Sequence, residues 1–322
     1  MLITLPLILF IIMAEVSIGS FTVLMLLDWR NEVKRGFLVS YALIYLGLTG
    51  LTYLFQQNFA TPDLLNTFSQ LDKGWTGYQT LPLLLFLLFM LPYNLLLWLD
   101  RKAGVESKKD EPEEQKTSGL SRVRLLRLLS GALAIAAGLA TLFVMGMIFR
   151  PLGVAYFGGI FTVASFFAAA LALGGVLTAM WLGHWYLVTP ALSEKPLQFA
   201  TTLVLVGVLV QVIIAFTASP STVAAHTQSG VSAGPPTISA ATPTPKNAFD
   251  PSVPVVAPLS TDVIGWIRIL VSFIMPLVLG SLAWKLIRDR SFQSATGMLY
   301  LVVVCTLAGE AMARGLFLAG LS

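Results

Sequence analysis

Long apolar segments separated by short polar ones set the pattern of this chain. Eight apolar segments are long enough to cross a hydrocarbon layer of about 30 Å at a rise of about 1.5 Å per residue. Each segment predicts a helix, because backbone N–H and C=O groups in hydrocarbon must find their partners within the segment. The predicted helices span residues 2–28, 36–56, 77–100, 123–149, 154–187, 197–217, 262–286 and 294–319.

The composition is typical of a membrane protein. Hydrophobic residues make up 56% of the 322 residues, charged residues make up 11%, and the mean hydropathy is +0.82. A soluble domain carries about twice that share of charge. The first apolar segment runs from Leu2 to Leu27 with no basic region before it, which predicts a retained spanning helix rather than a cleaved signal peptide. The sequence therefore predicts an all-α polytopic membrane protein.

Basic residues predict the orientation of the helices. Of the 20 Lys and Arg residues, 15 fall at one end of the predicted bundle. Because cytoplasmic loops carry the excess of Lys and Arg, this end is predicted to be cytoplasmic and both termini are predicted to be external. The positive net charge is therefore interpreted as a result of membrane topology and not as a sign of nucleic-acid binding. The crowded end holds Arg30, Lys34, Arg35, Arg101, Lys102, Lys108, Lys109, Lys116, Arg122, Arg124, Arg127, Lys195, Lys285, Arg288 and Arg290, and the other end holds Lys73, Arg150 and Lys246.

Two polar linkers interrupt the predicted bundle of two four-helix halves. Residues 101–122 mix acidic and basic side chains, which is typical of a solvated cytoplasmic tether. Residues 218–261 are rich in Pro, Ser, Thr and Ala, contain His226, and are predicted to form an external loop. The remaining ranges are 1–100 with the first three helices, 123–217 with the next three, and 262–322 with the last two.

Cysteine and histidine are too scarce to build a resident metal or redox centre. The chain has one cysteine, Cys305, and two histidines, His184 and His226. This content excludes an internal disulfide, a cysteine-ligated cluster from this chain alone and a haem held between two membrane histidines. It also argues against a zinc hydrolase and against a serine or cysteine nucleophile with a histidine base. No catalytic residue and no metal ligand is predicted, and any redox cofactor would be diffusible or held by a partner.

The ionisable residues deep in the predicted helices are the main candidates for function. Four such residues are predicted, namely Glu15, Arg268, Glu310 and Arg314. A charge at the centre of a bilayer costs about 2.5–3.5 kcal/mol on insertion scales, so each is a functional hypothesis. Glu310 and Arg314 are spaced i,i+4 and share one helix face, which allows them to pair. Convergence of the first, seventh and eighth helices would place all four in a charge-balanced pocket open to the outside.

Three interpretations of such a pocket stay open. The carboxylates can carry protons to and from a quinone while the arginines orient its ring carbonyls by charge-assisted hydrogen bonds. The pocket can equally bind a transported anion. The pair of Glu310 and Arg314 can also be a purely structural contact between packed helices.

Residues 183–190, Gly-His-Trp-Tyr-Leu-Val-Thr-Pro, end the fifth predicted helix at the cytoplasmic side. A Trp/Tyr pair is typical of the membrane interface, so His184 and Tyr186 are interpreted as interfacial anchors. The alternative is an inner proton entry or exit at His184, since histidine titrates near neutral pH.

The C-terminal segment 309–317, Gly-Glu-Ala-Met-Ala-Arg-Gly-Leu-Phe, resembles the ending of the eight-helix NrfD-like membrane anchors of dimethyl sulfoxide, polysulfide and nitrite reductase systems. Further similarities are Pro6-Leu7 with Gly19, Phe21 and Val23, the segment Trp266-Ile267-Arg268, and the predicted external N-terminus. The chain departs from that family at residues 55–63, which contain a proline but neither the histidine nor the arginine of the family's motif after the second helix.

The resemblance implies a subunit of a prokaryotic plasma membrane that carries no haem. Such an anchor exchanges electrons between a membrane quinone and an external iron–sulfur subunit. The expected partners are therefore the lipid bilayer and an external redox subunit, and the expected cofactor is a quinone. The alternatives are a non-catalytic structural or assembly subunit of a membrane complex and a transporter of a small solute.

Overall fold

A computed structural model describes residues 5–100, 103–104, 122–153, 159–189, 193–218 and 266–319. These residues form helices and no strand, and eight of the helical spans are long and apolar enough to cross a membrane. The predicted all-α polytopic membrane fold is confirmed. The predicted external loop with His226, nearly all of the predicted linker at 101–122, and Pro190 lie outside the described residues.

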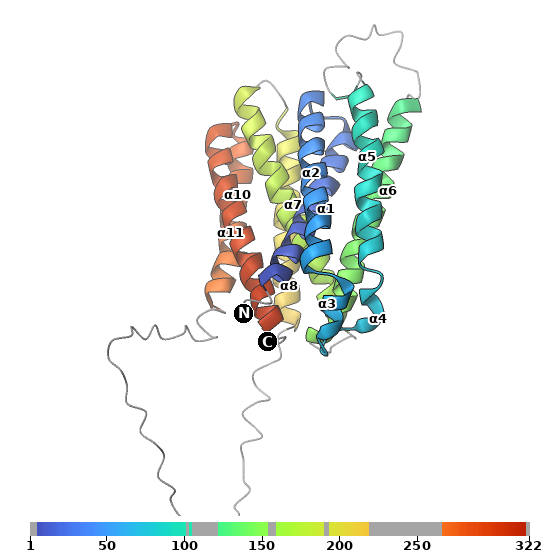
Figure 1. Ribbon diagram of the computed structural model, residues 1–322. Helices are drawn as coiled ribbons and strands as arrows, with labels where there is room; N and C mark the ends of the chain where they lie inside the picture. Colours follow the sequence, from blue (N-terminus) through green and yellow to red (C-terminus); the bar gives the residue numbers. More distant parts are fainter. Residues whose placement is uncertain are drawn as a thin grey trace, which may run out of the picture.

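The spans follow one another in chain order (Figure 1). The short helix α3 (Pro62–Thr67) lies between the second and third spans, α4 (Lys73–Thr76) begins the third span, and η3 (Arg150–Leu152) ends the fourth. The seventh span covers Trp266–Arg288 and contains a π-helical turn, η6 (Leu270–Ile274). The other described elements are α1 (Leu5–Arg30), α2 (Arg35–Phe59), α5 (Thr80–Leu99), α6 (Arg122–Phe149), α7 (Ile160–Val188), α8 (Lys195–Ala218), α10 (Met275–Arg288) and α11 (Phe292–Leu318).

The helices form two rings of four. In the first ring α1 contacts α2, α2 contacts α5, α5 contacts α6, and α6 returns to α1. The second ring repeats this order with α7, α8, the span of η6 and α10, and α11. The rings meet where α1 packs on α7. In addition, the last helix of each ring contacts the first helix of the other, since α6 contacts α7 and α11 contacts α1. These contacts are those expected of two like units related by a two-fold axis between α1 and α7. The end of the bundle where α1 begins and α11 ends is called the terminal end (Figure 1).

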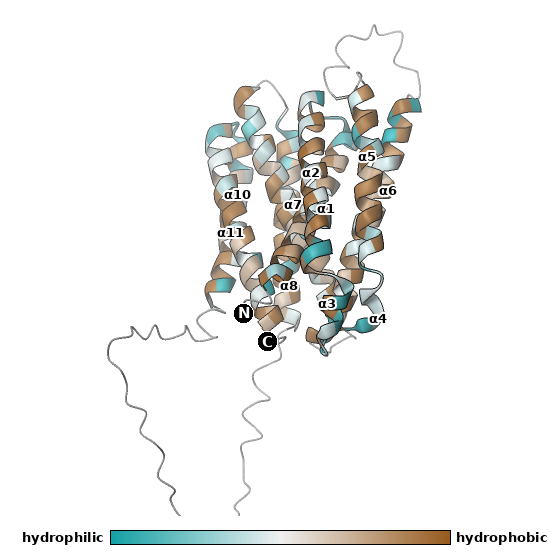
Figure 2. Cartoon of the chain, in the orientation of Figure 1, coloured by the Kyte–Doolittle hydropathy of each residue, from teal (hydrophilic) through white to brown (hydrophobic). Residues whose placement is uncertain are grey.

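Side chains distribute along the spans as a membrane protein requires. Hydrophobic residues cover most of the length of the helices, and hydrophilic residues gather mainly near the two ends (Figure 2). Many large apolar side chains on the outside are exposed, for example Leu43 and Val304, each at 63%. In water such a surface would be unfavourable, whereas in a bilayer it contacts lipid.

Two glycines allow α1 and α7 to cross at close range. A Cβ atom added to Gly19 would lie 1.8 Å from the carbonyl oxygen of Ala170, and one added to Gly174 would lie 2.0 Å from the carbonyl carbon of Gly19. Small residues let membrane helices pack through backbone contacts and dispersion, because apolar side chains gain little from leaving lipid. The contact between the two rings therefore depends on the absence of side chains at these positions.

Small residues on α6 form one buried and one exposed face. Gly131, Ala134 and Gly138 of α6 are buried, and a Cβ atom on Gly138 would lie 2.8 Å from the side chain of Ile18. Ala132, Ala136 and Ala140, on the other side of the same helix, are exposed. The pattern thus contains two separate small-residue faces, of which one holds α6 against α1.

Replacing Gly19 by Ala should lower the free energy of unfolding by about 1–3 kcal/mol, because the added methyl group overlaps the backbone of α7. Gly47→Ala in α2 is the matched control, since no atom lies within 4 Å of the position of its Cβ. Unfolding of the purified protein in mixed micelles measures both variants. Equal stability of the two variants would contradict the close crossing.

Candidate functional site

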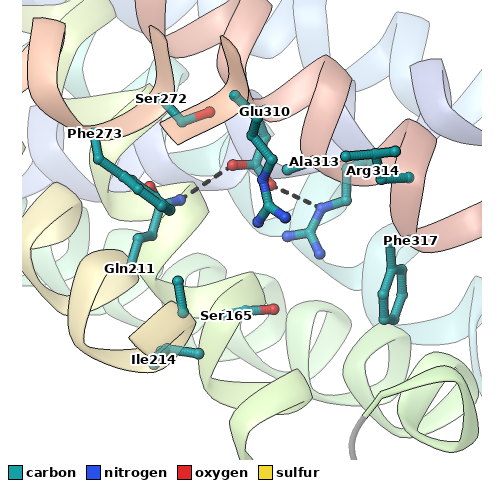
Figure 3. A pocket seen from close by; sticks show the side chains of 12 residues that line it. Ser165, Gln211, Ile214, Ser272, Phe273, Glu310, Ala313, Arg314 and Phe317 are labelled. Atoms are coloured by element: carbon teal, nitrogen blue, oxygen red, sulfur yellow. Dashed lines mark hydrogen bonds and ion pairs between the residues drawn. The ribbon is translucent and has the colours of Figure 1, made fainter. Parts of the chain in front are cut away.

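Three of the four predicted deep charges meet in one ion-pair cluster. Arg314 of α11 donates a hydrogen bond to Glu15 of α1, although the two lie far apart in the sequence. Nε of Arg314 also lies 2.8 Å from Oε1 of Glu310, one helical turn earlier (Figure 3). The i,i+4 pairing expected from the sequence is present, and it extends to a second carboxylate on another helix. These three residues are called the Glu15–Arg314–Glu310 triad.

The triad lies inside the bundle. Glu15 is fully buried, and Arg314 and Glu310 are 4% and 8% exposed. The guanidinium carbon of Arg314 lies 4.1 Å from the centroid of the Phe166 ring of α7, a cation–π contact. Oε2 of Glu15 is buried and has no hydrogen-bond partner among the described residues. The cation is therefore held on three sides, whereas one carboxylate oxygen stays unpaired.

A cavity of about 290 Å³ adjoins the triad. Its wall comes from α7, α8, the span of η6, and α11, so it lies within the second ring. Nε2 of Gln211 donates to Oε2 of Glu310 over 3.1 Å and fixes that carboxylate at the wall (Figure 3). Glu15 pairs with Arg314 but does not itself line the cavity. The lining residues are Ser165, Gln211, Ile214, Ala215, Arg268, Ser272, Phe273, Glu310, Ala313, Arg314, Leu316 and Phe317.

Arg268, the fourth predicted charge, lines this cavity without an ion-pair partner. It is half-buried, and its guanidinium carbon lies 6.0 Å from the centroid of the Phe273 ring. Within the described part of the chain it forms no ion pair and no hydrogen bond, and its Nε is buried without a partner. The cavity therefore offers a cationic donor to an acceptor from outside the chain.

The π-helical turn η6 brings a second donor to the cavity. A π turn inserts one extra residue into a helix and re-aims the side chains around it, and such turns are frequent at functional sites. The hydroxyl of Ser272 in this turn is buried, lines the cavity and has no hydrogen-bond partner within the described residues. A Cβ atom on Gly309 would lie 2.5 Å from that Oγ, so only glycine allows α11 to approach the turn this closely.

The residues predicted at the far end of α7 do not join this site. His184 is exposed, and Tyr186 is buried with its hydroxyl donating to the carbonyl of Ser193. Eighteen residues separate His184 from Phe166, which corresponds to about 27 Å along a helix. Neither His184 nor Tyr186 can contact a ligand in the cavity.

A second buried charge cluster at the opposite end corrects the expectation of only four deep charges. Arg127 of α6 is fully buried, and its guanidinium donates over 2.9 Å to Asp28 and over 2.7 Å to Asp100. The hydroxyl of Tyr93 donates to the other oxygen of Asp28 over 3.0 Å. The sequence assigns Arg127 to the basic flank of a linker, yet it lies in the second turn of α6 and faces α1. This cluster ties α1, α5 and α6 together.

Two buried amides of the first ring also escaped prediction. Gln56 and Gln79 are fully buried, and both side-chain polar atoms of each lack a partner within the described residues. Gln56 of the first ring corresponds to Gln211 of the second ring, which lies 155 residues later in the sequence. The same difference of 155 residues relates two equivalent helix contacts. These contacts are Ser17 with Thr52 in the first ring and Ala172 with Gly207 in the second.

No group of three His, Cys, Asp or Glu side chains in the described residues is placed to hold a metal ion. Comparisons of the chain with protein-family models, with curated proteins and with solved structures gave no match. The chemistry of the cavity must therefore be inferred from its own residues.

Replacing Arg127 by Gln should lower the free energy of unfolding by about 3–5 kcal/mol, because two buried carboxylates lose their common cation. Glu194→Gln, which breaks the exposed ion pair with Arg290, should leave stability unchanged. Unfolding in mixed micelles compares the variants. A small effect of Arg127→Gln, similar to that of the control, would show that the cluster does not hold the first ring together.

Proposed function

We propose that this chain is the membrane subunit of a multi-subunit oxidoreductase and that its cavity holds the ring of a membrane quinone. One observation carries the proposal: within apolar spans, a cavity of about 290 Å³ combines two donors without partners, Arg268 and Ser272, with the carboxylate of Glu310. Buried polar groups without partners are costly, so these donors favour a ligand that supplies acceptors.

A quinone ring fits the chemistry of this wall. Its carbonyl oxygens would accept hydrogen bonds from Arg268 and Ser272, and Phe273 and Phe317 provide apolar surface for the ring. Glu310 would accept a proton from the reduced form, as a carboxylate within reach of a hydroquinone hydroxyl does. The volume lies at the small end of ligand pockets, which suits one ring with its tail left in the lipid.

The segment that resembles the reductase anchors contributes directly to this cavity. Glu310, Arg314 and Phe317 line it, and Gly309 makes room for the π turn that carries Ser272. The spacing of these residues in the segment is therefore explained by their places at the cavity, which supports the resemblance. The electrons would pass to an iron–sulfur subunit on the terminal end of the bundle, which the distribution of basic residues assigns to the external side of a prokaryotic plasma membrane.

The position of the cavity favours this function over transport. Transporters built from repeats bind their substrates near the bilayer midplane, between the repeats. This cavity is lined by residues of the second ring alone, so it does not lie between the two rings. A non-catalytic assembly subunit would have no need of donors that lack partners.

Replacing Arg268 by Gln should weaken binding of a short-chain quinone analogue about tenfold, because one charge-assisted hydrogen bond is lost. Arg288→Gln is the matched control, since Arg288 is exposed at the other end of the same span. Equilibrium titration of the purified chain with the analogue measures both. Equal affinities of the two variants, or no binding by the unmodified chain, would contradict a quinone site at this cavity.

A further inference from the structure

We propose that the Glu15–Arg314–Glu310 triad holds one exchangeable proton, which enters at Glu310 and is shared with Glu15. The part this proton plays in turnover rests on the proposed quinone site. The proton site itself rests on the geometry of three side chains and can be tested without a quinone.

The charges of the triad do not balance when all three groups are ionised. Arg314 contacts both carboxylates, so one positive charge serves two negative ones. The remaining negative charge lies where exposure is 8% or less, and a buried charge without an ion-pair partner is unfavourable. Arg268 lines the same cavity but forms no ion pair with either carboxylate among the described residues, so it offsets this charge only in part. One bound proton makes the triad neutral and leaves a one-to-one ion pair. The unpaired Oε2 of Glu15 gives that proton a place, because no donor competes for it.

Among the described residues that line the cavity, Arg268 is the one charged side chain outside the triad. Arg268 lines the same cavity as Glu310 and Arg314, whereas the nearby side chains of α7 and α8 are the uncharged Phe166, Ser165 and Gln211. A ligand that accepts a hydrogen bond from Arg268 weakens the attraction between this positive charge and the carboxylates of the triad, and so favours the protonated triad. Occupancy of the cavity and protonation of the triad are therefore coupled, and the coupling acts in both directions.

The two carboxylates differ in access. Glu310 lines the cavity and accepts a hydrogen bond from Gln211 over 3.1 Å. Glu15 is fully buried, pairs with Arg314 and does not line the cavity. A proton released by a ligand in the cavity thus meets Glu310 first, while Glu15 keeps Arg314 in place when Glu310 is neutral. Glu310 is therefore the group at which the proton enters, and Glu15 is the second carboxylate that shares it.

A membrane-permeant carbodiimide tests this assignment, because it reacts with protonated carboxyl groups and converts them to neutral adducts that can no longer ionise. The purified full chain is treated without any quinone, and mass spectrometry of intact protein and peptides counts the adducts at Glu15 and Glu310. We expect one adduct per molecule over these two residues, since neutralising one carboxylate leaves the other in a one-to-one pair with Arg314.

Two variants sharpen the measurement. Glu310→Gln should reduce labelling of Glu15 about tenfold, because Arg314 then serves Glu15 alone. Glu194→Gln at the opposite end should leave labelling of the triad unchanged. Two adducts on one molecule, no adduct at either residue, or undiminished labelling of Glu15 in Glu310→Gln would overturn the proton site. A chain that carries the single adduct but binds no quinone analogue would support the proton site and contradict the quinone site.

Discussion

The fold depends on the requirement that a charge within an apolar span finds its partner inside the bundle. Helix α1 carries two fully buried carboxylates, Asp28 and Glu15, and each meets an arginine from the last helix of a ring. Arg127 binds α1 within its own ring, and Arg314 binds it across the contact between the rings. Such pairs add little net stability, but removing one partner is costly, so they fix the register of α1 against α6 and α11. Between them the crossing at Gly19 and Gly174 sets the distance to α7.

The candidate site follows from a difference between two similarly arranged rings. At corresponding positions the first ring has Gln56 and the second ring has Gln211, but only Gln211 has a charged partner, Glu310. The second ring also contains the π turn, which aims Ser272 at the cavity, and Arg268 at the start of the same span. The cluster of Arg127 and the triad around Arg314 thus use the same kind of ion pair. They differ in access, since only the second adjoins a cavity in which two donors lack partners.

Sequence reasoning predicted the helices and the charges better than it predicted the contacts. Apolar runs of spanning length define a helix almost by themselves, so all eight spans were predicted near their observed bounds. The cost of a deep charge singled out Glu15, Arg268, Glu310 and Arg314, which the fold brings to one end. Arg127 was misjudged because its place six residues into α6 looks like a basic flank, and only the packing of α1 shows that it is buried. The roles of Ser272 and Gln211 depend on a π turn and on contacts between helices, which no local pattern in the chain records.

Purification of the protein from its native membranes in a mild detergent tests the central claim most directly. If the cavity serves a quinone and passes electrons to a partner on the terminal end, the chain should be recovered with an iron–sulfur-containing subunit and with quinone that extracts from the complex. Recovery as a lone monomer, with neither quinone nor a redox partner, would contradict the account.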